Sequence, residues 1–350
     1  MSFEMGAVRA WEGEWRRKGL TLALLLALLL AASLWALSVG SASSSPLRVL
    51  EMLLSRSGPV YHVRLPRVIS AVVVGAALGS SGLVVQTLMA NPMATPFTLG
   101  ISSGAAFGAA AGILLLGLGQ FHRTGEGVTF LSPHLIPLFA FAGALASASL
   151  VLALGGLGGL RPEALVLCGV AMGSFFQALL MLLQYFAADE VMVSATLFWS
   201  FGNLGRMGFR EVLLVLSVLV LSLAYYLRRS WDYNALQLGD EVCASMGVDP
   251  LRLRLEGMGV SSLLVSACVS FSGVVGFVGL VAGKASRLLL GGDHLFLVPA
   301  SALLGAILLL LADTLGRTLI APVVIPVGIT TSLVGVPLLL YLLLGGRGDA

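Results

Sequence analysis

The chain has 350 residues, of which 58% are hydrophobic and only 11% are charged. Soluble domains carry about one-quarter charged residues, so this composition excludes an ordinary soluble protein and predicts a protein embedded in a membrane. The net charge of +3 gives no support to nucleic-acid binding, because cationic loops on the cytoplasmic face of a membrane produce the same surplus. At about 20 residues per span, the length accommodates about ten helices with short loops and leaves no room for a soluble catalytic domain.

Apolar runs predict ten spans along a single membrane domain that covers residues 1–350. The first run follows Arg16-Arg17-Lys18 and is too long for a typical signal-peptide core, so we expect a first span and not a cleaved leader. With residues 1–18 in the cytoplasm, ten spans return the C-terminus to the same side and place most basic residues there. The expected spans are 19–39, 66–88, 97–118, 134–155, 163–187, 211–228, 252–272, 274–285, 295–318 and 326–344.

Glycines four residues apart recur in these runs, as at Gly75 and Gly79, and at Gly169 and Gly173. This spacing lines small residues along one helix face, where a neighbouring helix can approach closely. We expect packing within the chain at most of these positions, and a dimer interface or a transport path at the remainder.

Ordered motifs stand at the ends of several spans. The first motif comprises Arg64-Leu-Pro-Arg67, then Gln86, then Asn91-Pro92-Met-Ala-Thr-Pro96 and Gly100-Ile-Ser-Ser-Gly104. Tyr233–Val248 and Gly276-Phe-Val-Gly-Leu280 follow, and the last motif combines Asp313, Arg317, Pro326 and Gly328. Together they resemble the permease subunits of ATP-binding-cassette importers for ferric siderophores, haem and vitamin B12. The resemblance implies the type II importer fold, which is all-α with about ten transmembrane helices and an inverted internal repeat.

Arg64, Arg67 and Arg317 fall at the predicted external ends of two spans. Arginines there can anchor helix ends by snorkelling, and Asp313 can pair with Arg317 four residues later. A guanidinium also presents a rigid, permanently charged fork to carboxylates. In the permeases that the chain resembles, matching arginines receive glutamates of a substrate-binding protein, and we expect that docking role here.

Residues 232–249 form an amphipathic stretch between two apolar spans. Gly239 supplies a break and Gly247 a helix stop, so we expect two short helices on the cytoplasmic face. A loop that only covers helix ends is the alternative. The segment resembles the coupling loop that such permeases insert into the ATPase subunit, which assigns ATPase contact to Asn234, Leu236, Leu238, Gly239, Glu241, Ala244, Met246 and Gly247.

Polar side chains on the fifth span are candidates for the transport path. Ser174, Gln177, Met181 and Gln184 fall near one helical face, and polar groups inside a bilayer are costly unless they meet partners or water. Hydrogen bonding to other helices explains them almost as well. Because the fifth span lines the path in related permeases, we favour the path.

The chain departs from the family pattern at two places. Gly283-Lys284 replaces the usual Pro-His pair, and Val324 replaces a glutamate. Without the usual proline and glutamate, the family pattern no longer predicts whether the helix kinks here or whether these positions take part in gating. Residues 276–287 look superficially like a phosphate-binding loop, but the glycine spacing is wrong and Ala285 stands where Ser or Thr would bind magnesium.

Nothing in the sequence points to an enzyme. The four histidines have no metal-ligand spacing, and Cys168, Cys243 and Cys268 suggest neither a disulfide framework nor a zinc site. We therefore expect no metal and no cofactor in this chain, with ATP and magnesium bound by a partner ATPase.

The expected partners are a second copy of the chain, two ATPase subunits and an external substrate-binding protein, all at a prokaryotic cytoplasmic membrane. The alternatives are an ion-gradient transporter and a membrane enzyme acting on lipid. The first needs carboxylates near mid-membrane and the second a catalytic cluster.

Overall fold

The computed structural model describes residues 2–39, 49, 51–52, 54–118, 121–124, 127–130, 135–187 and 189–345. The longer helices are α1 (Ser2–Ser38), α3 (Leu65–Leu88), α4 (Ile101–Leu115), α5 (Leu135–Leu157), α6 (Pro162–Phe186), α7 (Glu190–Ser200), α8 (Phe209–Arg228), α11 (Pro250–Ser272), α12 (Val278–Leu290), α13 (His294–Thr318) and α14 (Val327–Gly345). Between α8 and α11 come two short helices, α9 (Ser230–Leu236) and α10 (Asp240–Ser245). A π-helical turn (Val60–Arg64) and two 3₁₀ turns (Pro96–Leu99 and Leu204–Arg206) complete the helical elements.

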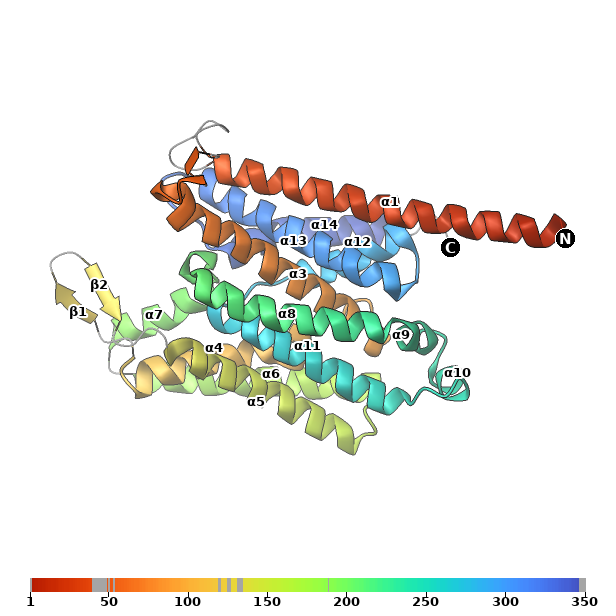
Figure 1. Cartoon of the computed structure of the whole chain (residues 1–350). Coiled ribbons are helices and arrows are strands. Elements are labelled where there is room, and N and C mark those ends of the chain that lie inside the picture. The colour runs from red at the N-terminus through yellow and green to blue at the C-terminus, as the bar shows by residue number, and fades with distance from the viewer. Residues whose placement is uncertain are drawn as a thin grey trace.

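The helices run side by side in one bundle with two distinct ends (Figure 1). One end carries α7 and the hairpin of β1 (Phe121–Thr124) and β2 (Gly127–Phe130), which pair antiparallel. The other end carries α9, α10 and the N-terminus of α1. Seven described helices are long and apolar enough to cross a membrane, and Ile101–Leu115 and Val327–Tyr341 are shorter apolar helices. The structure therefore confirms the predicted helical membrane fold.

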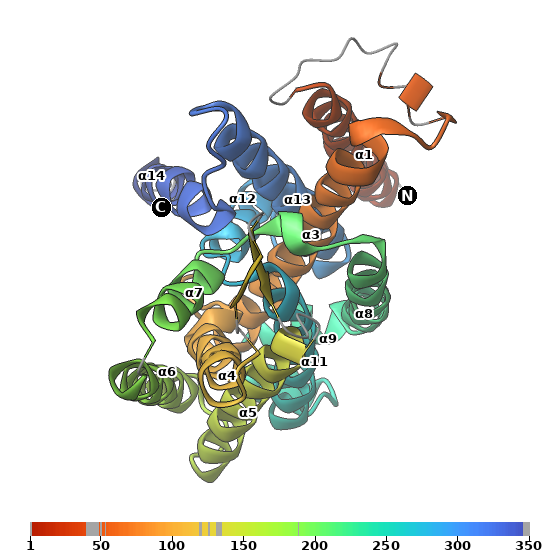
Figure 2. The ribbon, with the colours of Figure 1, turned by 90° about the vertical axis from the view of Figure 1, so that its left-hand side faces the viewer.

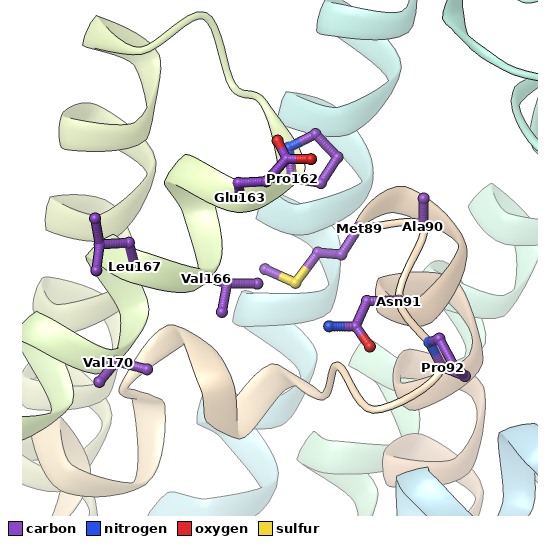
Figure 3. Close-up of a pocket in the computed structure, with 9 residues that line it drawn as sticks. All are labelled: Met89, Ala90, Asn91, Pro92, Pro162, Glu163, Val166, Leu167 and Val170. Carbon is purple, nitrogen blue, oxygen red and sulfur yellow. The ribbon is translucent and has the colours of Figure 1, made fainter.

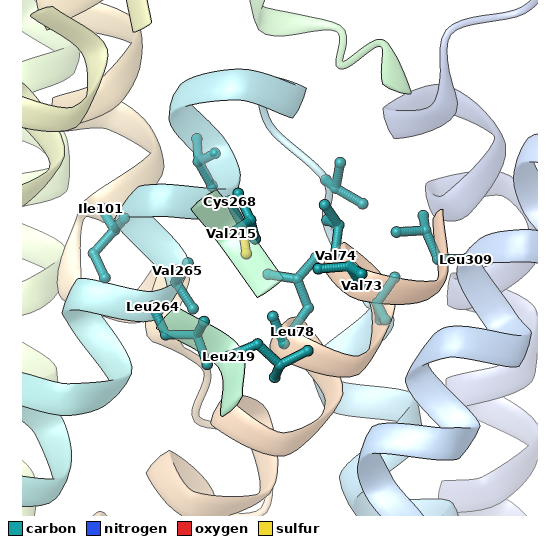
Figure 4. Packing of buried hydrophobic residues seen from close by; sticks show 14 of the residues in the cluster. Val73, Val74, Leu78, Ile101, Val215, Leu219, Leu264, Val265, Cys268 and Leu309 are labelled. Atoms are coloured by element: carbon teal, nitrogen blue, oxygen red, sulfur yellow. The ribbon is translucent and has the colours of Figure 1, made fainter. Parts of the chain in front are cut away.

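Helix α3 is the centre of the bundle. Within its most apolar window 83% of the residues are buried, against 22% in α6 at the periphery. Viewed from the hairpin end, α3 is surrounded by α1, α8, α11, α12 and α13 (Figure 2). The core between these helices is aliphatic (Figure 4), and its buried members include Val73, Val74, Leu78, Val215, Leu219, Leu264, Val265, Cys268 and Leu309.

Small residues allow α3 to approach its neighbours at backbone distance. A Cβ atom built on Gly75 would lie 2.8 Å from Ala306 Cα in α13, and one on Gly82 would lie 2.5 Å from Gly279 Cα in α12. Gly104 and Gly108 face α5 in the same way, and Gly169 faces Thr98. The predicted role of these glycines in packing within the chain is confirmed at these positions.

Two expected boundaries were wrong. The span expected at 97–118 begins as a helix only at Ile101, because Gly100 takes a left-handed conformation (φ +70°) after a 3₁₀ turn. The span expected at 274–285 is shifted to Val278–Leu290, because positive φ angles at Gly273 and Phe277 keep the intervening chain out of a helix. The first helix begins at Ser2, and its part suited to cross a membrane, Gly13–Ser38, agrees with the span expected at 19–39.

Two elements were not predicted at all. Helix α7 is short, and its start is capped by the Asp189 side chain, which accepts a hydrogen bond from the Val191 amide at 2.8 Å. The β1–β2 hairpin lies in a stretch that was expected to be a loop.

Candidate functional site

A buried charge cluster joins α3 and α13 near the hairpin end. Asp313 is fully buried, and its two carboxylate oxygens accept hydrogen bonds from Arg67 (Nε at 2.9 and 3.1 Å, Nη2 at 2.8 Å) and from Arg317 (Nε at 3.1 Å). The side chains of Arg67 and Arg317 are only 14% and 9% exposed. The expected i,i+4 pair between Asp313 and Arg317 is confirmed, and Arg67 is its unexpected third member.

Arg317 and a further arginine, Arg64, close the C-terminal end of α1. Arg317 Nη2 donates to the Ala36 carbonyl at 3.3 Å, and Arg64 Nη1 donates to the Leu37 carbonyl at 3.0 Å. The last carbonyls of a helix have no partner within the helix and carry partial negative charge, so cations stabilise that end. The structure thus shows Arg64 and Arg317 anchoring a helix end, and their docking role stays a prediction.

The amphipathic stretch forms the two short helices that were expected, at the opposite end of the bundle. Gly239 (φ +106°) separates α9 from α10, and Gly247 (φ +82°) follows the end of α10. Leu236 and Asn234 face inward, whereas Leu238 and Met246 are 64% and 62% exposed. Gly239, Glu241, Ala244 and Gly247 are exposed as well. Most of the predicted contact residues therefore form an open surface outside the apolar helices.

Directional polar contacts fix α9 and α10 to the bundle. Asp240 at the start of α10 binds Arg254 through both carboxylate oxygens at 2.7 Å, and these hydrogen bonds hold the pKa of the Asp240 carboxyl below its usual value. In α9, Asn234 Nδ2 donates to Asp293 at 3.0 Å, and Asn234 Oδ1 accepts from the His294 amide at 2.9 Å. The burial of Tyr233 raises the pKa of its hydroxyl.

A cavity of about 510 Å³ opens beside the end of α3. Figure 3 shows Met89, Ala90, Asn91 and Pro92 from the α3–α4 connection on one side of it, with the first turns of α6 opposite. The α6 lining consists of Pro162, Glu163, Val166, Leu167 and Val170. Asn91 and Pro92, singled out by the sequence, thus line a cavity at the α9–α10 end of the bundle.

Three of the predicted path residues share an open face of α6. Ser174, Gln177 and Met181 are exposed on the described chain, whereas Gln184 is partly buried and donates to Thr196 of α7 at 2.8 Å. An exposed Gln177 side chain on a helix suited to cross a membrane needs water or another protein surface. The arrangement leaves the path assignment a prediction.

The remaining motif residues shape turns and close contacts. The Asn91 side chain accepts from the Met93 amide at 2.9 Å, and Pro96 opens the 3₁₀ turn that precedes Gly100. Gln86 is buried, with its amide 3.5 Å from the Gly279 carbonyl of α12. Gly328, two residues after Pro326, donates its amide to the Phe201 carbonyl at 3.0 Å, and this bond holds the start of α14 against the end of α7.

Sequence reasoning missed the residues that link α9 and α10 to the rest of the bundle. Arg254 is 5% exposed and His294 is fully buried, although both lie in helices with long apolar runs. Their position inside such helices is the signal that could have found them, because ionisable groups there need a partner. The described residues contain no group of three or more His, Cys, Asp or Glu side chains able to hold a metal ion.

Comparison with known proteins assigns the family. The model of the FecCD transport family matches residues 27–345, which is nearly the whole chain. The chain belongs to the FecCD transport family. It is therefore a multi-pass membrane permease of the kind found in ABC importers, as the resemblance implied.

Individual relatives agree with this assignment. The permease is 45% identical to a putative ABC transporter permease protein of Methanocaldococcus jannaschii, over 92% of this chain and 93% of that protein. It is 38% identical to the hemin transport system permease protein of Yersinia pestis, over 94% and 96% of the two chains. A solved structure described as an inward-facing conformation of a putative metal-chelate type ABC transporter matches with a TM-score of 0.80 at 29% identity, covering 93% of this permease and 99% of that chain.

Proposed function

We propose that the permease imports a metal chelate, with an iron complex as the first candidate, and that a separate ATPase drives it through α9 and α10. The observation that carries this proposal is the exposed apolar surface on α10 and the turns that flank it. Leu238, Val242 and Met246 are 64%, 43% and 62% exposed, and they lie outside the seven helices suited to cross a membrane. An exposed apolar patch of this kind marks a contact with another protein.

In this proposal ATP and magnesium stay on the ATPase, and the α9–α10 end faces the cytoplasm together with both termini. The membrane is the cytoplasmic membrane of a prokaryote. The hairpin end then faces an external substrate-binding protein, for which Arg64, Arg67 and Arg317 supply positive charge. Two copies of the permease form the path between them, with Ser174, Gln177 and Met181 on the open face of α6 turned toward the partner copy.

The relatives support the class of substrate. The Yersinia pestis relative is named for hemin, and the matching solved structure is named for a metal chelate. A gradient-driven transporter has less support, because the described buried carboxylate Asp313 is neutralised by two arginines. A carboxylate that carries protons or ions must be able to lose its partner.

The first test is mass spectrometry of the complex purified from its native membrane in mild detergent. We expect two copies of the permease with two ATPase chains. Reconstitution in proteoliposomes with ferric citrate, haem and cobalamin as probes then identifies the substrate by ATP-dependent uptake. A permease that transports a probe without any ATPase would refute the proposal.

A matched pair of variants tests the contact surface. Met246→Ser removes an exposed apolar side chain directly after α10, and Leu213→Ser removes a similarly exposed one (66%) from α8. We expect only the first to release the ATPase during purification, because Leu213 lies within a membrane-spanning helix.

A further inference from the structure

Hydrogen bonds through one arginine each connect both short helices to the last turn of α3. For α10 the connecting residue is Arg254 of α11. Its Nη1 and Nη2 atoms hold the two oxygens of Asp240, each at 2.7 Å, while its Nε donates to the carbonyl of Leu88 at 3.0 Å. The planar guanidinium therefore fixes α10 and the end of α3 to each other in one orientation.

For α9 the connecting residue is Arg287 of α12. Its Nη1 donates to Gln237, the residue that directly follows α9, at 3.0 Å, and its Nη2 donates to Thr87 Oγ1 at 2.6 Å. The ring of His294 completes the link, with Nε2 2.7 Å from Thr87 Oγ1 and Nδ1 2.8 Å from Asn234 Oδ1. Thr87 is thus the point at which two contacts from α9 converge.

Thr87 and Leu88 are the last two residues of α3. The residues that follow, Met89 to Pro92, form one wall of the cavity beside α6 (Figure 3). Apolar packing lets helices slide past each other, whereas these hydrogen bonds are directional, and all of them except the exposed Arg287–Gln237 bond are partly or fully buried. A displacement of α9 and α10 must either break the contacts or carry the end of α3 with it.

We propose that Arg254 and Arg287 are positioning residues that transmit movement of α9 and α10 to the last turn of α3, and so to the Met89–Pro92 wall of the cavity. The inference rests on the proposed function, since the ATPase supplies the movement. The inference adds to the proposed function the contacts within this chain through which α9 and α10 both act on the end of α3.

The experiment uses the permease reconstituted with its ATPase, and a maleimide reagent as probe. Met93 is 45% exposed and follows the cavity wall directly, so Met93→Cys reports on that wall. Labelling rates are compared without nucleotide and with ATP plus vanadate, and the chain without the introduced cysteine gives the background. Coupling energies along such networks correspond to changes on the order of 2- to 30-fold, and we expect a nucleotide effect in this range.

Two variants break the contacts of Arg254 or Arg287 with the short-helix segment, and a third variant is the matched control. Asp240→Asn combined with Gln237→Ala breaks the Arg254 ion pair and the Arg287–Gln237 hydrogen bond from their exposed ends and leaves the Asn234–His294 contact in place, and Arg254→Gln breaks the Arg254 ion pair from its buried end. Arg252→Gln is the control, because Arg252 lies two residues from Arg254 and pairs with Glu256 of its own helix at 2.7 Å. We expect the nucleotide effect to disappear in the first two variants and to persist in the control, while ATP hydrolysis continues in all.

An unchanged nucleotide effect in the Asp240→Asn, Gln237→Ala double variant would overturn the inference while leaving the proposed function intact. Absence of the effect in the parent despite ATP hydrolysis by the bound ATPase would also overturn it. Failure of any ATPase to bind the permease would instead overturn the proposed function.

Discussion

Replacement of Asp313 by asparagine tests the buried charge cluster most sharply. The change keeps the volume of the side chain but removes the charge that Arg67 and Arg317 share, so two guanidiniums less than 15% exposed lose their counter-ion. Breaking a buried ion pair from one side costs about 3–5 kcal/mol. At roughly 2 °C per kcal/mol, we expect Asp313→Asn to lower the melting temperature by about 6–10 °C.

The assay is thermal unfolding in detergent, followed by the reaction of the cysteines with a thiol-reactive dye. Cys243 and Cys268 are buried, and burial raises the pKa of the Cys243 thiol, so both thiols react only as the fold opens. The control is Asp232→Asn, which removes a partly exposed pair with Arg229 and should cost about 0–1 kcal/mol. Equal melting temperatures for the two variants would refute the idea that the cluster fastens α3 to α13.

Three further predictions follow from other sites. Arg64→Glu should weaken binding of the substrate-binding protein by roughly 10- to 150-fold, the equivalent of 1.5–3 kcal/mol for one charged contact; unchanged affinity in a titration would reject the docking role. Because the pKa of Asp240 is lowered by Arg254, its pairing should persist from neutral pH down to about pH 4 and be lost as the pH falls through the lowered pKa, measured by hydrogen exchange of α10; loss already at pH 6 would contradict this. Gly82→Ala should destabilise the fold by at least about 1–3 kcal/mol, because its Cβ would press on the Gly279 backbone. Gly259→Ala, where nothing lies within 4 Å, should leave the melting temperature unchanged or raise it.

The apolar runs predicted most of the bundle, because long stretches without charges must cross the bilayer as helices. Helix α7 was missed because it is short and lies between two spans at the hairpin end. The shift of α12 depends on the conformation of Phe277, whose positive φ angle is not a property that a phenylalanine side chain suggests. The inverted repeat stays a prediction.

The candidate sites likewise contain some features that local sequence predicts and others that depend on tertiary packing. Gly239 separates α9 from α10 and Gly247 follows the end of α10, so the division into two short helices could be predicted from the local sequence. The partners of Asp313 show what local sequence could not predict. Arg317 is four residues away and was expected. Arg67 is 246 residues away and reaches Asp313 only because α3 and α13 pack closely through glycine. The convergence of Arg254 and Arg287 on the end of α3 likewise depends on tertiary packing.

The capping of α1 constrains the order in which contacts form during synthesis. Synthesis runs from the N-terminus, so α1 is made first, yet the guanidinium that donates to its Ala36 carbonyl belongs to a residue 281 positions later. Arg64, which donates to the Leu37 carbonyl, is made soon after α1, but the hydrogen bond from Arg317 to the Ala36 carbonyl can form only after α13 has been made. Helix α13, near the end of the chain, thus completes the capping of the first helix, α1.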